Sequence, residues 1–310
     1  MKNLLFFLLF ALSAGVLFTS CKDDDENPPS VADLAVSNAN LSILVDALQR
    51  ADLITTLNGD GPFTVLAPTN DAFTALLNTL GATSLNDIPV DQLRAILLNH
   101  VISGSVRSGD LATGYVTTLA TGPNNSPISL YVEKTSGVKF NNTATVTTAD
   151  VIGSNGVVHI IDKVLTIPNV VNHALNNPDF SILVTALTRP DLGVDYVSIL
   201  SGTGPFTVFA PTNAAFVALL QELGASSLND IPAATLNAVL QYHVVSGANV
   251  RSSQLTNEQQ VTTFQGGKFT VNLTNGAKIT DAKNRVSNVI AVDVQGSNGV
   301  VHAIDKVLLP

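Results

Sequence analysis

The stretch Phe63-Thr-Val-Leu-Ala-Pro-Thr-Asn-Asp-Ala-Phe73 decides the fold, because it returns as Phe206-Thr-Val-Phe-Ala-Pro-Thr-Asn-Ala-Ala-Phe216. The offset is 143 residues, and 28 of the 42 positions that begin with these stretches are identical. A second block, residues 153–165, returns at 296–308 with 12 of 13 positions identical. A period this long indicates two tandem domains rather than a solenoid of short repeats.

Upstream of these blocks the offset falls to 139 residues, where Leu41-Ser-Ile-Leu44 aligns with Phe180-Ser-Ile-Leu183. The second copy therefore carries four extra residues. We place them in the turn before Gly204-Pro205, since loops tolerate insertions. The sequence thus predicts a first domain over 31–167 and a second over 168–310.

Each copy is predicted to begin with helices and to end with strands. In the first copy, the apolar spacing over 41–48 predicts an amphipathic helix, and residues 63–67 form a strand that Pro68 stops. Two further helices follow, one ending at Gly81 and one beginning after Pro89. Thr/Val-rich stretches separated by Gly, Asn and Ser then predict strands over 114–120, 128–133, 138–141, 144–150 and 157–165. Helices first and strands later indicate an α+β fold.

The composition allows a folded core and argues against two classes of partner. The 310 residues are 45% hydrophobic and 13% charged, which is enough apolar surface for a core. The net charge of −9 argues against nucleic acid as a partner, because phosphate binding needs concentrated positive charge. It also argues against a polybasic membrane patch.

The first thirty residues predict export and a lipid anchor. Residues 4–18 are an almost unbroken apolar run, too short for the roughly 20 residues of a membrane-spanning helix and typical of a signal peptide. The run ends in Phe18-Thr-Ser-Cys21, which resembles the lipobox of bacterial lipoproteins. This resemblance implies a signal peptide over 1–20, lipidation of Cys21, and attachment to the membrane through that lipid.

Residues 22–26 are Lys-Asp-Asp-Asp-Glu, and Asn-Pro-Pro-Ser follows. The acidic stretch resembles the signal that sends lipoproteins to the outer face of the outer membrane in some Gram-negative bacteria. A solvated spacer is the alternative interpretation. We therefore expect residues 21–30 to be a lipidated linker, and the protein to be an outer-membrane lipoprotein at the cell surface.

Three ordered motifs occur in each copy: the Phe63–Phe73 stretch, Asn99-His100-Val101, and Asn155-Gly-Val-Val-His-Ile-Ile-Asp-Lys-Val-Leu165. The second copy has Tyr242-His243-Val244 for the middle motif. Together they resemble the two signature blocks and the central Tyr-His motif of fasciclin domains. The resemblance implies two tandem fasciclin-like domains, each a β-wedge or sandwich with helices packed along it.

The resemblance also implies roles in cell adhesion, extracellular matrix or surface attachment, without catalysis and with no cofactor. In animal matrix relatives the Tyr-His region is linked to integrin binding. The first copy departs from that pattern, because Asn99 stands where the family often has Tyr.

We interpret His100 and His243 mainly as structural residues near helix ends, where a cation suits the helix dipole. Contact of these histidines and of Tyr242 with a partner is the alternative.

His159 and His302 are expected to be half-buried, structural strand residues. Asp162 and Asp305 follow three positions later and so fall on the opposite face of the strand, which argues against a His–Asp catalytic pair. No Gly-x-Ser-x-Gly elbow accompanies them. The sequence predicts that the protein is not an enzyme and has no metal site.

Two further repeated pairs have structural and functional interpretations. Asn70 and Asn213 precede helices, and capping explains them. The turn Leu85-Asn-Asp87-Ile88-Pro returns with Asp230 and Ile231. It resembles the Asp-Ile adhesion motifs of animal fasciclin proteins, although Asn-Asp before Ile-Pro is also an ordinary turn.

The leading hypothesis is a surface lipoprotein that mediates adhesion or biofilm attachment. Its partner would be an envelope or matrix protein or polysaccharide. The alternative is a lipoprotein that binds a glycan or small molecule in a cleft lined by the polar strands of 114–150 and 257–281.

Overall fold

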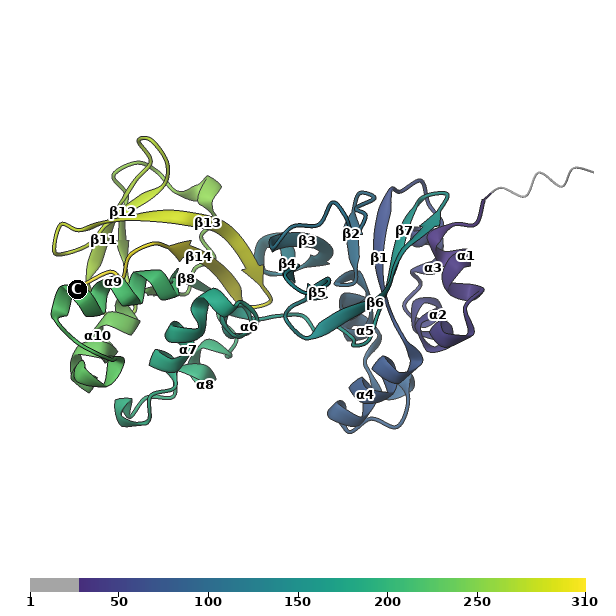
Figure 1. The fold of residues 1–310 in the computed structure, drawn as a ribbon, viewed down its shortest axis with the longest axis horizontal. Helices are drawn as coiled ribbons and strands as arrows, with labels where there is room; N and C mark the ends of the chain where they lie inside the picture. The colour runs from purple at the N-terminus through teal and green to yellow at the C-terminus, as the bar shows by residue number, and fades with distance from the viewer. Residues whose placement is uncertain (1–27) are drawn as a thin grey trace, which may run out of the picture.

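A computed structural model describes residues 28–310 and shows two α+β units that follow one another along the long axis of the molecule (Figure 1). Domain 1 contains the elements from α1 to β7, and domain 2 those from α6 to β14. The predicted signal peptide, Cys21 and the acidic stretch lie outside the described residues. No helix within residues 28–310 is long and apolar enough to cross a membrane.

Domain 1 has five α-helices among its described residues: α1 (Val31–Val36), α2 (Ser42–Arg50), α3 (Ile54–Leu57), α4 (Asn70–Leu80) and α5 (Val90–Leu98). Short 3₁₀ turns are η1 (Ala39–Leu41), η2 (Leu85–Asp87) and η3 (Pro123–Asn125). Its strands are β1 (Phe63–Pro68), β2 (Val101–Ser103), β3 (Gly114–Thr121), β4 (Pro127–Glu133), β5 (Lys139–Phe140), β6 (Ala144–Gly153) and β7 (Gly156–Ile161).

Domain 2 repeats this order with helices α6 (Val170–Asn176), α7 (Ser181–Leu187), α8 (Tyr196–Leu200), α9 (Asn213–Leu223) and α10 (Ala233–Tyr242). Its 3₁₀ turns are η4 (Pro178–Phe180), η5 (Pro190–Leu192), η6 (Leu228–Asp230) and η7 (Ser252–Gln254). Its strands are β8 (Phe206–Pro211), β9 (Val244–Ser246), β10 (Gln260–Thr262), β11 (Lys268–Asn272), β12 (Lys278–Thr280), β13 (Val286–Gly296) and β14 (Gly299–Ile304).

The strand of the decisive stretch has the same two neighbours in both sheets. In domain 1, β1 lies parallel to β7 and antiparallel to β2, and the seven strands form a closed barrel. In domain 2, β8 lies between β14 and β9 in a seven-stranded sheet of order β10-β11-β12-β13-β14-β8-β9. The α+β prediction is therefore confirmed.

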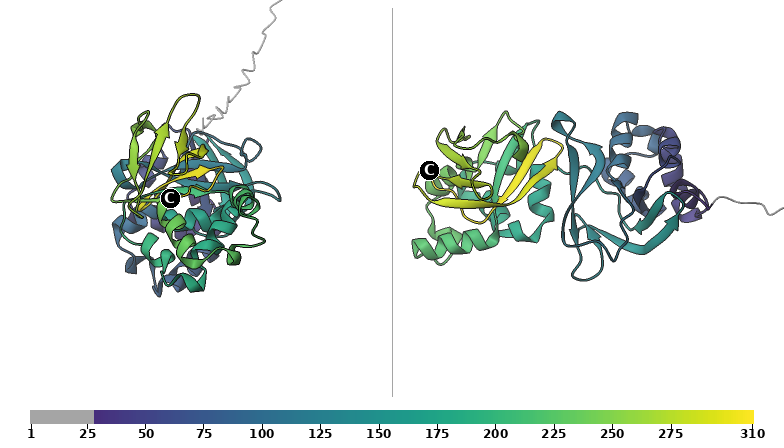
Figure 2. Two further views of the ribbon diagram at one scale, coloured as in Figure 1. Left: turned by 90° about the vertical axis from the view of Figure 1, so that its left-hand side faces the viewer. Right: turned by 90° about the horizontal axis from the view of Figure 1, so that it is seen from above.

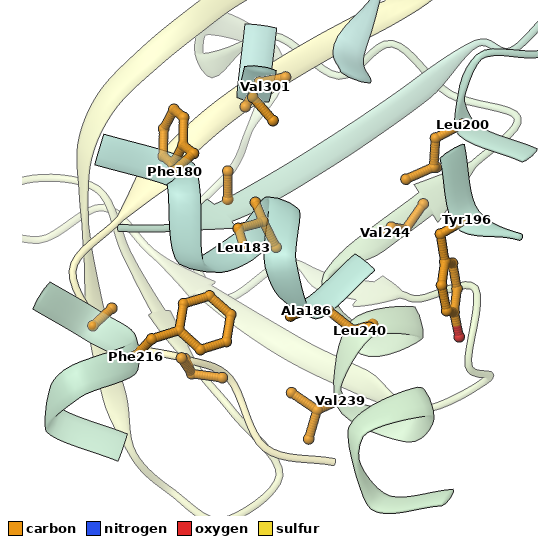
Figure 3. Close-up of a cluster of buried hydrophobic side chains, with 14 of the residues drawn as sticks. Phe180, Leu183, Ala186, Tyr196, Leu200, Phe216, Val239, Leu240, Val244 and Val301 are labelled. Carbon is orange, nitrogen blue, oxygen red and sulfur yellow. The ribbon is translucent and has the colours of Figure 1, made fainter. Parts of the chain in front are cut away.

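The strand of the decisive stretch is buried on both faces. In β8, Phe206, Val208 and Ala210 face the helices, while Phe209 packs into the interior of the sheet. The helix-side core of domain 2 also contains Phe180, Phe216 and Leu240 (Figure 3). Side chains that alternate along one strand thus enter two cores, which is why every residue of the strand except one threonine is apolar.

The Asn-Gly turn before the last strand connects that strand to the first helix of each domain and to the segment before its first strand. The Asn155 side chain accepts the Val31 N–H at 2.9 Å and donates to the Leu57 and Gly59 carbonyls, both at 2.7 Å. Gly156 is required because a Cβ there would lie 2.0 Å from the Phe63 carbonyl oxygen. Asn298 makes the same three contacts in domain 2, with the Val170 N–H and the Leu200 and Gly202 carbonyls.

The two domains meet through β4 of domain 1 and β13 of domain 2, whose hairpin with β14 reaches domain 1 (Figure 2). The Gln295 N–H donates to Ser129 Oγ at 3.0 Å, and both residues are buried. Asn177 Nδ2 donates to the Tyr115 hydroxyl at 3.1 Å. These contacts join the two domains through buried polar groups.

Two details differ from the sequence-based expectations. The first helix comes earlier than expected, because α1 precedes the expected helix of residues 41–48 and begins with a Ser30–Asp33 capping box. The closing strand, expected over 157–165, ends at Ile161. At Asp162 the backbone N–H still donates to the Thr145 carbonyl at 3.1 Å, but the Thr145 N–H donates to the side-chain oxygen Oδ1 of Asp162 at 2.7 Å, so the side chain ends the backbone ladder.

Candidate binding site

The two histidines of the central motif connect distant backbone segments. The backbone continues from α5 into His100, whose Nδ1–H donates to the Ile96 carbonyl at 2.8 Å and whose Nε2 accepts the Leu165 N–H at 2.8 Å. His243 does the same with Val239 at 2.7 Å and Leu308 at 2.9 Å. Each ring therefore joins a helix end to the segment after the last strand.

Both rings are buried and uncharged at neutral pH. Burial lowers the pKa of His100 and of His243 to about 4. Because Nε2 accepts a backbone N–H, the ring cannot be protonated without losing that bond. The expectation of a cation at the helix C-terminus was therefore wrong, and desolvation of the ring is the reason.

Tyr242 and Asn99 occupy the same position in the two domains and are both fully buried. The Tyr242 hydroxyl donates to the Lys268 carbonyl at 2.5 Å and accepts the Ala282 N–H at 3.2 Å. Asn99 Nδ2 instead donates to the Leu165 and Thr166 carbonyls, at 3.2 and 3.3 Å. Neither side chain reaches the surface of the folded domain.

His159 and His302 lie in β7 and β14 and are 0% and 1% exposed, so the expectation of half-burial was wrong. The reason is that the strands are covered on both faces. His159 Nδ1 accepts the Asp150 N–H at 3.2 Å, and Nε2–H donates to the Val106 carbonyl at 3.0 Å. His302 makes the matching contacts with Asp293 and Val250.

A serine and a carboxylate lie beside each of these histidines, a grouping that the sequence pattern missed because the three residues are far apart in the chain. Ser108 Oγ donates to Asp150 Oδ2 at 2.5 Å, and this hydroxyl lowers the pKa of Asp150. Both nitrogens of His159 are occupied by backbone groups, so the ring has no free site to take a proton from the serine. Domain 2 repeats the grouping with Ser252 and Asp293.

The remaining aspartates of the last signature block hold the ends of strands. Asp305 accepts the Asn288 N–H at 2.7 Å and a bond from Asn288 Nδ2 at 2.6 Å, as Asp162 accepts the Thr145 N–H. Both lie beyond the last residue of their strand. No group of three or more His, Cys, Asp or Glu residues in the described chain could hold a metal ion.

Asn70 and Asn213 differ from the capping role expected of them. The N-cap of α4 is Thr69, which accepts the Ala72 N–H at 3.3 Å. Asn70 lies one residue inside the helix, and its side chain accepts the Ile43 N–H at 3.0 Å and donates to the Ala39 carbonyl. Asn213 contacts Ile182 and Pro178 in the same way. Each asparagine side chain therefore bonds backbone groups at the start of a neighbouring helix instead of capping its own helix.

The Asp-Ile turns divide into an exposed carboxylate and a buried isoleucine. Asp87 accepts bonds from the Thr83 hydroxyl, Thr83 N–H and Ser84 N–H, and the hydroxyl in particular lowers its pKa. Ile88 is 3% exposed. Asp230 and Ile231 repeat this arrangement, with the Ser226 hydroxyl lowering the pKa of the carboxyl group. A partner would meet the aspartate and the turn backbone, not the isoleucine.

Two grooves flank these turns, one in each domain. The domain 1 groove has a volume of about 700 Å³ and lies between α2, α4 and the η2 turn. Arg50 crosses it and donates to the Leu85 carbonyl at 2.6 Å, with Asp46 and Gln49 beside it. The domain 2 groove, of about 470 Å³, lies between α9 and α10 and is lined mainly by aliphatic side chains. Both grooves lie against helices rather than against the polar strands at which a cleft was expected.

A model of the Fasciclin domain matches residues 39–168 and 178–310, which together make up most of the chain. The chain belongs to the fasciclin domain family. The resemblance found in the signature blocks is thereby confirmed, and the motif residues described above are those of two fasciclin domains.

Relatives of this fasciclin protein occur in bacteria and animals. Protein sll1483 of Synechocystis sp. is 40% identical over 139 residues, which cover 45% of this chain and 74% of the relative. Transforming growth factor-beta-induced protein ig-h3 of Sus scrofa is 29% identical over 259 residues, covering 82% of this chain and 35% of the relative. Human periostin is 30% identical over 258 residues, covering 82% of this chain and 29% of periostin.

The fold is also similar to a solved structure, a FAS1 domain pair from the insect cell adhesion molecule Fasciclin I. The TM-score is 0.51 at 22% identity, over 90% of this chain and 96% of the other. At this identity the similarity shows the fold, and it confirms the prediction of two tandem fasciclin domains.

Proposed function

We propose that this protein is an exported, non-catalytic lipoprotein that mediates cell adhesion or matrix or biofilm attachment through its two fasciclin domains. The observation that carries the proposal is the tandem match to the fasciclin family over most of the chain. It is supported by the similarity to a domain pair from a cell adhesion molecule. The partner is an envelope or matrix protein or polysaccharide.

The burial of the signature residues narrows where such a partner would bind. His100, Tyr242 and His243 are buried, so a direct contact would require local unfolding of the domain. The exposed Asp87 turn lies next to the 700 Å³ groove, which offers Asp46 and Arg50 as charged contacts. We therefore place the adhesive contact on the surface formed by this turn and groove.

The adhesive role is tested with the soluble chain beginning at residue 22, coated on beads. Beads carrying the chain should bind cells or their matrix, and beads carrying an unrelated acidic protein should not. An Asp46→Lys/Arg50→Glu variant reverses the charges of the groove and should bind several-fold less. Equal binding by coated and control beads would contradict the role, whereas equal binding by the variant would contradict only the chosen surface.

The anchor is a separate part of the proposal and rests on the Phe18–Cys21 stretch. Labelled palmitate should be incorporated into the wild-type protein and not into a Cys21→Ala variant. Equal labelling of both proteins would exclude lipidation at this cysteine. Protease treatment of intact cells then distinguishes display at the surface from an inward-facing anchor.

A further inference from the structure

The domain 2 groove has the shape of a site for a small apolar molecule. Its volume of about 470 Å³ lies within the roughly 300–1,000 Å³ of such sites. Aliphatic walls come from α9, the turn before α10, α10 and the segment after β14, and they include Leu219, Leu223, Ile231, Val239 and Leu309. Leu223 is 53% exposed, so an apolar surface remains open to solvent at this place.

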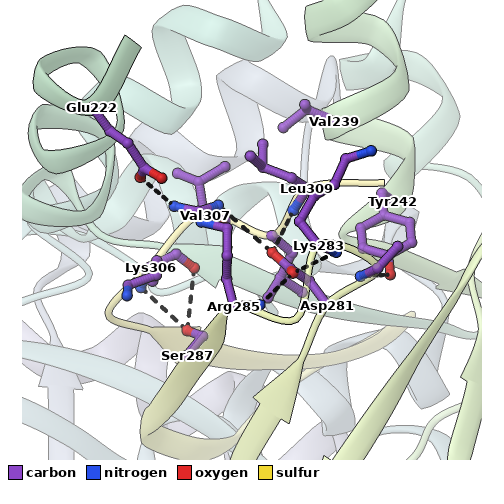
Figure 4. A network of polar contacts seen from close by, with 12 residues as sticks. Glu222, Val239, Tyr242, Asp281, Lys283, Arg285, Ser287, Lys306, Val307 and Leu309 are labelled. Carbon is purple, nitrogen blue, oxygen red and sulfur yellow. Dashed lines mark hydrogen bonds and ion pairs between the residues drawn. The ribbon is translucent and has the colours of Figure 1, made fainter.

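One wall of the groove is held in place by two charged side chains. Asp281 is 4% exposed and accepts the Leu309 N–H at 3.0 Å. Arg285 donates to the Val307 carbonyl at 2.8 Å and pairs with Glu222 of α9 at 2.7 Å (Figure 4). The wall is thus tied to the β12–β13 turn and to α9, so the groove is formed before any ligand binds.

These groups belong to domain 2 alone. The chain passes from β5 to β6 through Asn141-Asn-Thr143, whereas the β12–β13 turn is longer and contains Asp281, Lys283 and Arg285. At equivalent positions, which are 143 residues apart, domain 2 has Ala234 where domain 1 has Asp91, and Leu309 where domain 1 has Thr166. The substitutions make the groove apolar in domain 2, and the longer turn adds a cation to its rim.

That cation is Lys283, an exposed residue that also lines the groove. Its side chain extends past Leu309 toward α10 (Figure 4). The neighbouring carboxylates are already engaged, Asp281 by backbone N–H groups and Glu222 by Arg285. Lys283 forms no ion pair with any residue of the described chain.

We infer that this groove binds a fatty-acid anion, with the acyl chain between α9 and α10 and the carboxylate at Lys283. An apolar groove with the cation Lys283 at its rim is complementary to an apolar chain with an anionic end. A stable protein partner would bury more than about 1,000 Å² of surface, which exceeds what a groove of this size offers. The inference does not depend on the adhesive role.

The test measures binding of decanoate and dodecanoate, below their micelle concentrations, to the soluble chain beginning at residue 22. Each added methylene should tighten binding by about 3- to 4-fold until the groove is filled. Lys283→Gln should weaken decanoate binding by about 2- to 5-fold and leave decanol binding unchanged. No saturable binding by the wild type, or an equal loss of decanol binding in Lys283→Gln, would overturn the inference.

A matched pair of variants places the ligand in domain 2. Ala234→Asp introduces the residue that domain 1 has at this position, in the first turn of α10 where an acidic residue is tolerated. It should weaken binding more than 10-fold, because it brings a carboxylate against the acyl chain. Asp91→Ala in domain 1 is the control and should leave binding unchanged. Equal binding by Ala234→Asp and wild type, with unchanged melting temperatures, would place the ligand elsewhere.

Discussion

Asn99 in domain 1 and Tyr242 in domain 2 occupy one position of a shared fold, yet they complete their domains differently. Tyr242 fills the interior of its sheet, where its ring packs against Phe269, and bonds the backbone at Lys268 and Ala282. Asn99 is shorter and bonds the segment that leads into domain 2, at Leu165 and Thr166. The comparison shows that the histidine beside this position makes the same two backbone contacts in both domains, while the preceding residue adapts to the local packing.

The largest expected loss of stability follows substitution at the position where the domains differ, Tyr242 in domain 2 and Asn99 in domain 1. Tyr242→Ala removes a fully buried ring and should lower the free energy of unfolding by about 3–5 kcal/mol. Asn99→Ala should cost about 1–3 kcal/mol, because it leaves buried carbonyls without donors. Urea unfolding of the soluble chain measures both. A larger loss for Asn99→Ala would reverse the comparison.

Acidification should destabilise both domains, because each contains at least one buried histidine with a lowered pKa. The pKa values of His100, His173 and His243 are each lowered to about 4 in the folded protein, against about 6.5 when unfolded. The unfolded chain therefore binds more protons between these values. Stability is fully present above pH 6.5 and falls as the pH drops toward 4, by about 3 kcal/mol per histidine.

Urea unfolding at several pH values measures this loss. Because domain 2 contains two of these histidines and domain 1 only one, domain 2 should lose more stability. Substitution of His173 by Leu, the residue at the equivalent position 34, should reduce the difference between the domains. A stability that does not change between pH 7 and pH 4.5 would contradict the assigned ring states.

The Asn-Gly turns allow the same substitution to be compared in the two domains, with a smaller expected loss of stability. Asn155→Ala and Asn298→Ala each remove three backbone contacts and should cost about 1–3 kcal/mol. Asn298 is 6% exposed and Asn155 is partly exposed, so the loss should be greater in domain 2, where water cannot replace the contacts. Thermal unfolding of the two variants decides the order.

The smallest expected effect is at the contact between the domains. Tyr115→Phe removes one hydrogen bond to Asn177 and keeps the ring against His173, at 6.0 Å between ring centres. The cost should be about 0.5–1.5 kcal/mol. Calorimetry of the soluble chain should show a lower unfolding temperature for domain 2. An unchanged profile would mean that the bond does not stabilise the pair.

Local patterns in the sequence were sufficient to predict the α+β class and the two repeated domains, whereas the fasciclin architecture was predicted from the resemblance of the signature blocks. Apolar alternation, proline stops and the repeat of β1 as β8, which differs only in Phe209 for Leu66, each reflect contacts within a few residues or between equivalent segments. The fine positions of Thr69 and Asn70 were not predictable, because either residue can cap a helix and only the nearby α2 start decides which one does.

The candidate site was harder to predict because its groups come from distant parts of the chain. Ser108 and Asp150 are 42 residues apart, and no spacing marks them as neighbours. Burial of both faces of β7 is likewise a tertiary property, so His159 was expected to be more exposed than it is. The domain 2 groove depends on a longer turn at Asp281–Arg285, whose effect on the far wall is visible only in the folded chain.

The adhesive role is tested most directly by attachment of cells that lack the gene, compared with cells complemented by the wild type or by Cys21→Ala. The account predicts that deletion reduces attachment or biofilm formation, that the wild type restores it, and that Cys21→Ala does not because the domains are no longer held at the cell. Unchanged attachment of the deletion strain in several assays would contradict it.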